Sequence, residues 1–85
     1  MTAAEALEKV RGLAAPGRYV VSQHARQRMR QRGVREGDLR HALENAHACS
    51  PQADDKWKVD GPDLDGDELT VVVVIDDGLV VVTLF

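Results

Sequence analysis

The sequence predicts an α+β domain in which two or three N-terminal helices pack on a three- to four-stranded antiparallel sheet that ends in a β-hairpin. Three observations predict this fold. Apolar residues recur at helical spacing in the first half of the chain, β-branched residues dominate residues 69–85, and a turn sequence divides that last stretch in two. The length of 85 residues suits a single domain, residues 1–85, with a thin hydrophobic core.

The first predicted helix begins behind a capping box. Thr2 and Glu5 have the spacing at which each side chain satisfies a backbone donor of the other. Apolar residues at positions 7, 10, 13 and 14 then keep helical spacing, and Pro16-Gly17 ends the helix.

The second predicted helix covers residues 24–32. Residues 19–21 form a short apolar run before it, which is either a strand or an extended entry to the helix. Ser22 is a favourable N-cap, and Gly33 stands where a left-handed C-terminal residue is usual.

A third helix is predicted over residues 36–46, because apolar residues recur there at i, i+3, i+4 and i+7. Residues 47–55 hold Ser-Pro and Asp-Asp pairs and are predicted to form a loop. Residues 56–60 alternate polar and apolar side chains, which indicates a strand with one wet face. Residues 61–67 read as an acidic turn or loop.

The strongest local prediction is the C-terminal hairpin of residues 69–75 and 79–85. Asp77-Gly78 between the two runs favours a type I′ turn, in which both residues have positive φ. That turn predicts three cross-strand pairs: Ile75 with Val80, Val73 with Val82, and Val72 with Thr83. Since both runs are apolar on both faces, we expect helices on one side and another partner, such as a second subunit, on the other.

Charge is distributed unevenly. Residues 1–41 contain nine basic and four acidic residues, a balance of +5, and residues 42–85 contain two basic and ten acidic residues, a balance of −8. A net charge of −3 would argue against nucleic acid, but a local basic patch can still bind phosphate because fields decay within about 8–10 Å. Mutual neutralisation of the two halves is the alternative interpretation.

The most informative segment is the basic second helix. On a helical wheel His24, Arg28 and Arg32 line one flank of the buried stripe that Ala25 and Met29 mark. Histidine can move a proton near neutral pH, and arginine can hold phosphate oxygens in a bidentate manner. The three side chains therefore form a candidate phosphodiester site, with a solvated basic helix as the alternative.

The motif Ser-x-His-Ala-x-x-Arg-Met-x-x-Arg-Gly-Val over residues 22–34 resembles that of an uncharacterised family of small bacterial domains. Asp-Leu-x-x-Ala-Leu over residues 38–43 and the final Val-Val-Thr-Leu-Phe extend this resemblance. Such domains are similar in architecture to the RelE and BrnT toxins, which are metal-independent ribonucleases. The resemblance implies one RelE/BrnT-like domain with catalytic His24, Arg28, Arg32 and Thr83.

The expected function is therefore that of a toxin-like, metal-independent endoribonuclease or RNA-binding domain without a cofactor. The alternative is a non-catalytic protein-binding or assembly module, with an antitoxin-like or other protein partner or a second copy of the chain. The additional residues expected to bind RNA are Arg26, Arg30, Lys56, Trp57 and Lys58. Trp57 could stack on a base, although a lone tryptophan more often belongs to the core.

Metal sites have weak support in the sequence. His24, His41, His47 and Cys49 could be assembled as zinc ligands, but the six-residue spacing of His41 and His47 does not place them on one helix face. Cys49 is interpreted as a buried or incidental thiol.

The acidic segment over residues 63–67 resembles the opening of a calcium loop. An EF-hand loop would need glycine at its sixth position and glutamate at its twelfth, where this chain has Glu68 and Val74. A solvated acidic loop is therefore preferred, and no metal is expected.

A reducing cytoplasm is the expected compartment, because the chain has one cysteine and no signal peptide. The longest apolar run, residues 71–75, is far too short to cross a bilayer, so no membrane association is expected.

Overall fold

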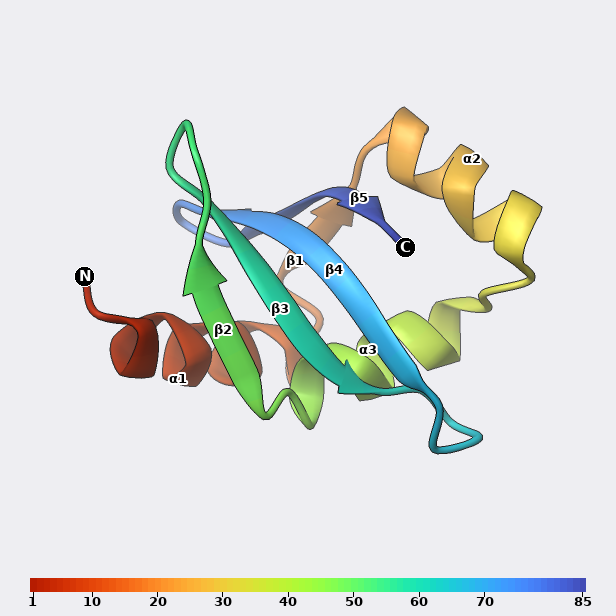
Figure 1. Cartoon of the computed structure of the whole chain (residues 1–85), viewed down its shortest axis with the longest axis horizontal. Coiled ribbons are helices and arrows are strands. Elements are labelled where there is room, and N and C mark those ends of the chain that lie inside the picture. The colour runs from red at the N-terminus through yellow and green to blue at the C-terminus, as the bar shows by residue number, and fades with distance from the viewer.

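The computed structural model describes all of residues 1–85 and contains three helices and five strands (Figure 1). The helices are α1 (Ala3–Ala14), α2 (Gln23–Arg32) and α3 (Glu36–Glu44). The strands are β1 (Tyr19–Val21), β2 (Ala48–Pro51), β3 (Lys56–Pro62), β4 (Glu68–Ile75) and β5 (Leu79–Leu84). The expected α+β class is confirmed.

The five strands form one mixed sheet in the order β1-β5-β4-β3-β2, so the expectation of an antiparallel sheet of three or four strands is wrong. β1 runs parallel to β5. Leu79 N–H donates to the Arg18 carbonyl (3.0 Å), and Ser22 N–H donates to the Val81 carbonyl (2.9 Å). The sequence of a three-residue strand gives no sign of a partner sixty residues away, because such pairing is decided by packing of the whole chain.

β2 lies within the segment that was predicted to be a loop. It pairs antiparallel with β3, and the turn between them contains Asp54 and Asp55 with φ of 61° and 60°. Aspartate adopts this left-handed conformation more readily than most residues. The strand escaped prediction because Ala48 and Ser50 have little β propensity and Pro51 suits only the edge of a sheet.

The helices are capped as the sequence predicts. Thr2 and Glu5 form the reciprocal capping box of α1. The Ser22 hydroxyl accepts a hydrogen bond from the Ala25 N–H, and Gly33 ends α2 with φ of 66°. The third helix ends at Glu44, earlier than expected, with Ala46 still buried just beyond it.

The C-terminal hairpin forms, but its turn and part of its register differ from the prediction. Ile75 pairs with Leu79, and Val73 pairs with Val81, which makes the connection three residues long and excludes the type I′ turn. Neither Asp77 nor Gly78 has positive φ. A β-bulge beside Val72 and Val73 then restores the predicted pair of Val72 with Thr83.

One face of the sheet carries the core. α1 and α3 lie behind the strands in the view of Figure 1, and α2 lies beyond the end of β1. Leu39 and Leu43 of α3 pack with Val59, Val73 and Val81 of the sheet in one cluster of almost fully buried side chains. The opposite face of the sheet has no helix over it (Figure 1).

None of the three helices is long and apolar enough to cross a membrane.

Candidate nucleic-acid interface

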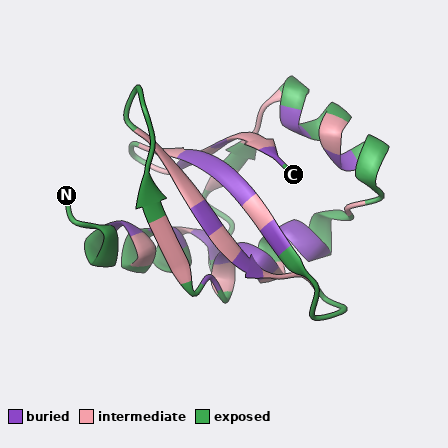
Figure 2. Cartoon of the chain, viewed as in Figure 1, coloured by how far each residue is buried: buried purple, intermediate pink, exposed green.

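Helix α2 is fixed to the free edge of β5. β1 pairs only with residues 79–81, so the second half of β5 has no strand neighbour on that side. The Ser22 hydroxyl donates to the Val82 carbonyl (2.9 Å), and the Arg28 Nε donates to the Leu84 carbonyl (3.3 Å). Ala25 and Met29 insert between these two anchors into the core. The helix therefore takes the place that a further strand would occupy, and its remaining sides face solvent (Figure 2).

The arginines of α2 have no carboxylate partner in the folded chain. The ion pairs of the structure involve Arg35, Arg40 and His47, and none involves a residue of α2. The helix itself contains no acidic residue. The side chains exposed along it include Arg26, Arg30 and Arg32.

The acidic half of the chain does not neutralise this helix. Its carboxylates gather in the turns between strands, at positions 54–55, 63–67 and 76–77. In this half Asp65 forms an ion pair with Arg35 at 3.7 Å and Glu44 forms one with Arg40 at 2.9 Å, but neither arginine belongs to α2. The charge asymmetry of the sequence is thus retained in three dimensions, with α2 as a compact cationic element.

His24 lies in the first turn of α2, one turn before Arg28. Its side chain is exposed and makes no hydrogen bond within the chain. No cleft encloses it, because the only hollow on the surface runs along α1, between Glu5, Glu8, Lys9 and Gly12. The imidazole is therefore free to meet a bound phosphodiester, but nothing in the chain holds it in one orientation.

Thr83 and two of the predicted lysines share the uncovered face of the sheet. Thr83 pairs with Val72, and Val72 pairs in turn with Lys58, so the three side chains lie in one row across β5, β4 and β3. Lys56 lies in the neighbouring row. Thr83 also stands between the two carbonyls that anchor α2, which brings it beside that helix.

Trp57 does not belong to this surface. Strand alternation places it on the opposite face from Lys56 and Lys58, and it packs half-buried against the core cluster. The structure therefore does not bring the three residues of this segment together as one RNA platform.

The residues considered as zinc ligands are dispersed. His41 Nδ1 is 2.9 Å from the Pro62 carbonyl oxygen, and His47 Nε2 is 2.6 Å from Glu68 Oε1. Cys49 is half-buried beside the core, and burial raises its thiol pKa. A thiol in such surroundings is a poor nucleophile at neutral pH.

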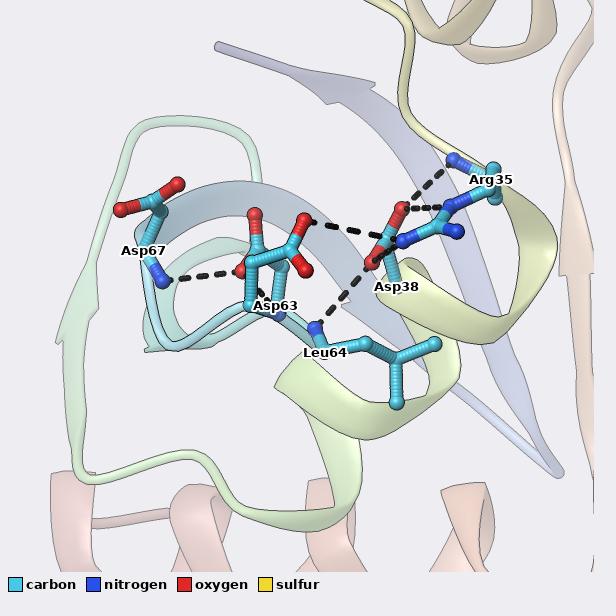
Figure 3. Close-up of polar contacts among 6 residues, drawn as sticks. Arg35, Asp38, Asp63, Leu64 and Asp67 are labelled. Carbon is cyan, nitrogen blue, oxygen red and sulfur yellow. Dashed lines mark hydrogen bonds and ion pairs between the residues drawn. The ribbon is translucent and has the colours of Figure 1, made fainter.

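The carboxylates of Asp38, Asp63 and Asp65 converge, and Arg35 pairs with two of them, Asp38 and Asp65 (Figure 3). Asp38 accepts hydrogen bonds from the Arg35 side chain and backbone, and also from the Leu64 N–H at 3.1 Å. The Arg35 side chain, followed by these backbone bonds, lowers the pKa of Asp38 to about 2. The cluster fixes the acidic loop to the start of α3, and the Arg35 guanidinium already offsets the charge of two of its three carboxylates.

Sequence reasoning missed the anchoring roles in this site. The sequence predicts only a helix cap at Ser22 and only a phosphate ligand at Arg28. Their bonds to β5 depend on the Val82 and Leu84 carbonyls, which stay unpaired because β1 is short. No local sequence pattern indicates that these carbonyls are free.

A comparison with protein families finds a match over residues 21–85 to a family described as "Domain of unknown function (DUF4258)". The matched region runs from the last residue of β1 through α2 and α3 to the end of the sheet. No curated protein and no solved structure is significantly similar to the chain.

Proposed function

The chain belongs to the DUF4258 family of unknown function, and from its surface we propose an RNA-binding domain in which α2 holds the phosphate backbone. One observation carries the proposal: Arg26, Arg28, Arg30 and Arg32 have no carboxylate partner, although the chain has an excess of acids. Four guanidiniums on one short helix repel one another, and bound phosphates relieve this repulsion.

The length of α2 suits contact with a short stretch of the RNA phosphate backbone. Arg28 and Arg32 lie one turn, about 6 Å, apart on one flank of this helix, so they can contact neighbouring phosphates. The Nε of Arg28 donates a hydrogen bond to the Leu84 carbonyl. Its two terminal nitrogens have no partner within the chain and are available to bind a phosphate. Lys58 and Thr83, on the face beside α2, extend the same surface.

Cleavage is the stronger form of the proposal, in keeping with the toxin-like resemblance. His24 would act as general acid or base at the 2′-hydroxyl or at the leaving oxygen. Arg28 and Arg32 would stabilise the charge that develops on the phosphorane, and Thr83 would orient a phosphate oxygen. This mechanism requires no metal. The open surroundings of His24 favour RNA binding as the minimal function.

The experiment compares Arg32→Gln with Lys9→Gln. Each variant removes one exposed cation that has no ion pair, and Lys9 lies on α1, away from the proposed surface. Binding of a fluorescent single-stranded RNA is measured by anisotropy between about 50 and 200 mM salt. We expect Arg32→Gln to weaken binding and to reduce the salt slope by about 0.7, the value for one phosphate contact on a single strand.

Lys9→Gln should leave both quantities unchanged. Equal effects of the two substitutions would show that binding follows net charge alone. A wild type without salt-dependent RNA affinity would refute the proposal and favour a protein-binding role.

A further inference from the structure

The sheet face opposite α1 and α3 carries apolar side chains, although polar side chains are expected on a solvent-exposed face. On an antiparallel sheet covered on one side, outward positions are normally polar. Here the outward row of Val20, Val80 and Val74 crosses β1, β5 and β4, and Lys56 continues it on β3. Val20 is 62% exposed and Phe85, at the end of β5, is 46% exposed. No helix lies over this face of the sheet (Figure 1), and Val74 and Val80 are half-buried among their neighbours.

The second row is less apolar, and its one valine, Val72, is only 8% exposed. Thr83 and Val72 occupy β5 and β4, and Lys58 follows on β3. Val82, the extra residue at the bulge, adds to the apolar part. The face thus has two parts. Valines lie on β1, β5 and β4, and Lys56 and Lys58 on β3 form a lysine border beside them.

We propose that this face docks one amphipathic helix of a partner protein, with its apolar side on the valines and acidic residues along the lysine border. This inference does not depend on RNA binding by α2. It adds a protein-binding surface that shares Lys58 and Thr83 with the proposed RNA surface.

The width of the apolar part selects a helix. Neighbouring strands are about 4.8 Å apart, so Val20, Val80 and Val74 span roughly 10 Å. An α-helix with its side chains is about 10–12 Å across, which matches this span when the helix lies along β5. Docking an apolar helix face in such a surface is a recurring mode of recognition.

The border selects the charge of the partner. Neither Lys56 nor Lys58 forms an ion pair. Asp60 follows them on the same face, and its carboxylate keeps its charge while it accepts a hydrogen bond from the Thr70 hydroxyl at 2.7 Å. The border is therefore positive at Lys56 and Lys58 and ends at Asp60, and the two unpaired ammonium groups favour glutamate or aspartate on the facing flank of the helix.

A second copy of the chain fits this face less well. A stable dimer buries about 800 Å² on each partner, which would extend beyond the three valine strands. The contact would then include Lys56, Lys58 and Asp60 of both copies, and charged residues are depleted from the buried core of an interface. Valine side chains also offer RNA bases no ring to stack on.

The test uses two synthetic helical peptides with the same leucine face. One has glutamates along one flank, and the other has lysines at the same positions. Binding is followed by two-dimensional amide NMR of the labelled full chain. We expect the glutamate peptide to shift residues of β1, β4 and β5 around Val20, Val74 and Val80, and to bind at least about tenfold more tightly than the lysine peptide.

Val80→Lys should abolish binding of the glutamate peptide. Val20→Lys serves as a second variant, because this exposed edge residue can be replaced without disturbing the core. Neither substitution should lower the RNA affinity, because each adds a cation, and Arg32→Gln should keep the wild-type peptide affinity. These two controls separate failure of the docking face from failure of the RNA surface.

Three results would overturn the inference. The first is no binding of either peptide. The second is chemical-shift changes on α2 instead of the sheet, which would mean simple attraction of an acidic peptide to arginines. The third is a dimer in sedimentation velocity that Val80→Lys dissociates, because the occupant would then be a second copy.

Discussion

The side chain of Arg28 donates a hydrogen bond from Nε to the backbone carbonyl of Leu84, 3.3 Å away. This bond ties the basic helix α2 to the last strand at the point where β1 no longer covers it. Arg28 is thus one of the four arginines of α2 and also helps to hold this helix in place. The side chain of Arg32, in the next turn, makes no hydrogen bond or ion pair within the chain.

Arg28→Met is expected to lower stability, because it leaves the Leu84 carbonyl without its donor. Loss of such a bond costs about 1–2 kcal/mol, and about 1 kcal/mol lowers the Tm of a domain of this size by roughly 4–8 °C. Arg32→Met is the matched control and should leave Tm unchanged. Thermal unfolding by circular dichroism measures both, and equal Tm values would mean that the Arg28 bond contributes nothing.

His24→Ala separates catalysis from binding. If the chain cleaves RNA, this substitution should reduce the rate by roughly 10²–10⁴-fold, the usual contribution of general acid–base catalysis. Tm should not change, because the imidazole is exposed and makes no hydrogen bond. The measurement pairs a gel-based cleavage assay with a thermal melt. Undiminished cleavage by the variant would remove His24 from the mechanism.

Gly61→Ala should disrupt the packing of β3 on α3. A Cβ at this position would overlap the backbone carbonyl of Ala42 and approach the Cα of Ala46 to 3.1 Å. Backbone atoms cannot move aside as a flexible side chain can, so we expect a loss of at least about 2–3 kcal/mol. Urea unfolding measures the loss. Gly12→Ala, an open position on α1, is the control and should be neutral or stabilising.

Asp38→Asn should make stability less dependent on acid pH. The pKa of Asp38 is about 2 in the folded chain, below its ordinary value of 3.8, so the unfolded chain binds the proton more readily. The stabilisation by Arg35 is therefore complete above about pH 4 and is lost as the pH falls toward 2.

The Asp38→Asn variant should accordingly have a Tm several degrees lower at pH 7, and its difference from the wild type should shrink between pH 4 and pH 2. Asp65→Asn, which removes only the exposed 3.7 Å pair with Arg35, should follow the wild type closely. A difference that stays constant down to pH 2 would contradict the assignment of the low pKa to this carboxylate.

Patterns within single elements allowed much of the fold to be predicted. The caps at Thr2 and Ser22, the left-handed Gly33 and the two valine runs act over a few residues, and each was found where the sequence placed it. The flank of α2 that carries His24, Arg28 and Arg32 could also be predicted, because residues one turn apart share a side of a helix.

Local patterns misled where a distant contact decides the outcome. Asp77-Gly78 suggested a two-residue turn, but the carbonyl of Arg18 comes so close to Gly78 that a Cβ there would lie 2.9 Å from it. The glycine is therefore needed for this close approach rather than for positive φ, and the register shifts by one residue before the bulge compensates.

By itself, then, the sequence determined the helices, the valine strands and the row of arginines, since helical and strand periodicity and capping act over a few neighbouring residues. Only the tertiary structure decided that β1 lies parallel to β5, that the free edge beyond it receives α2 through Ser22 and Arg28, and that no acid meets the arginines. The first two of these features depend on which backbone groups remain unpaired once the whole sheet has formed, because a buried backbone group needs a hydrogen-bond partner. The third depends on where the chain places the turns that contain the acids.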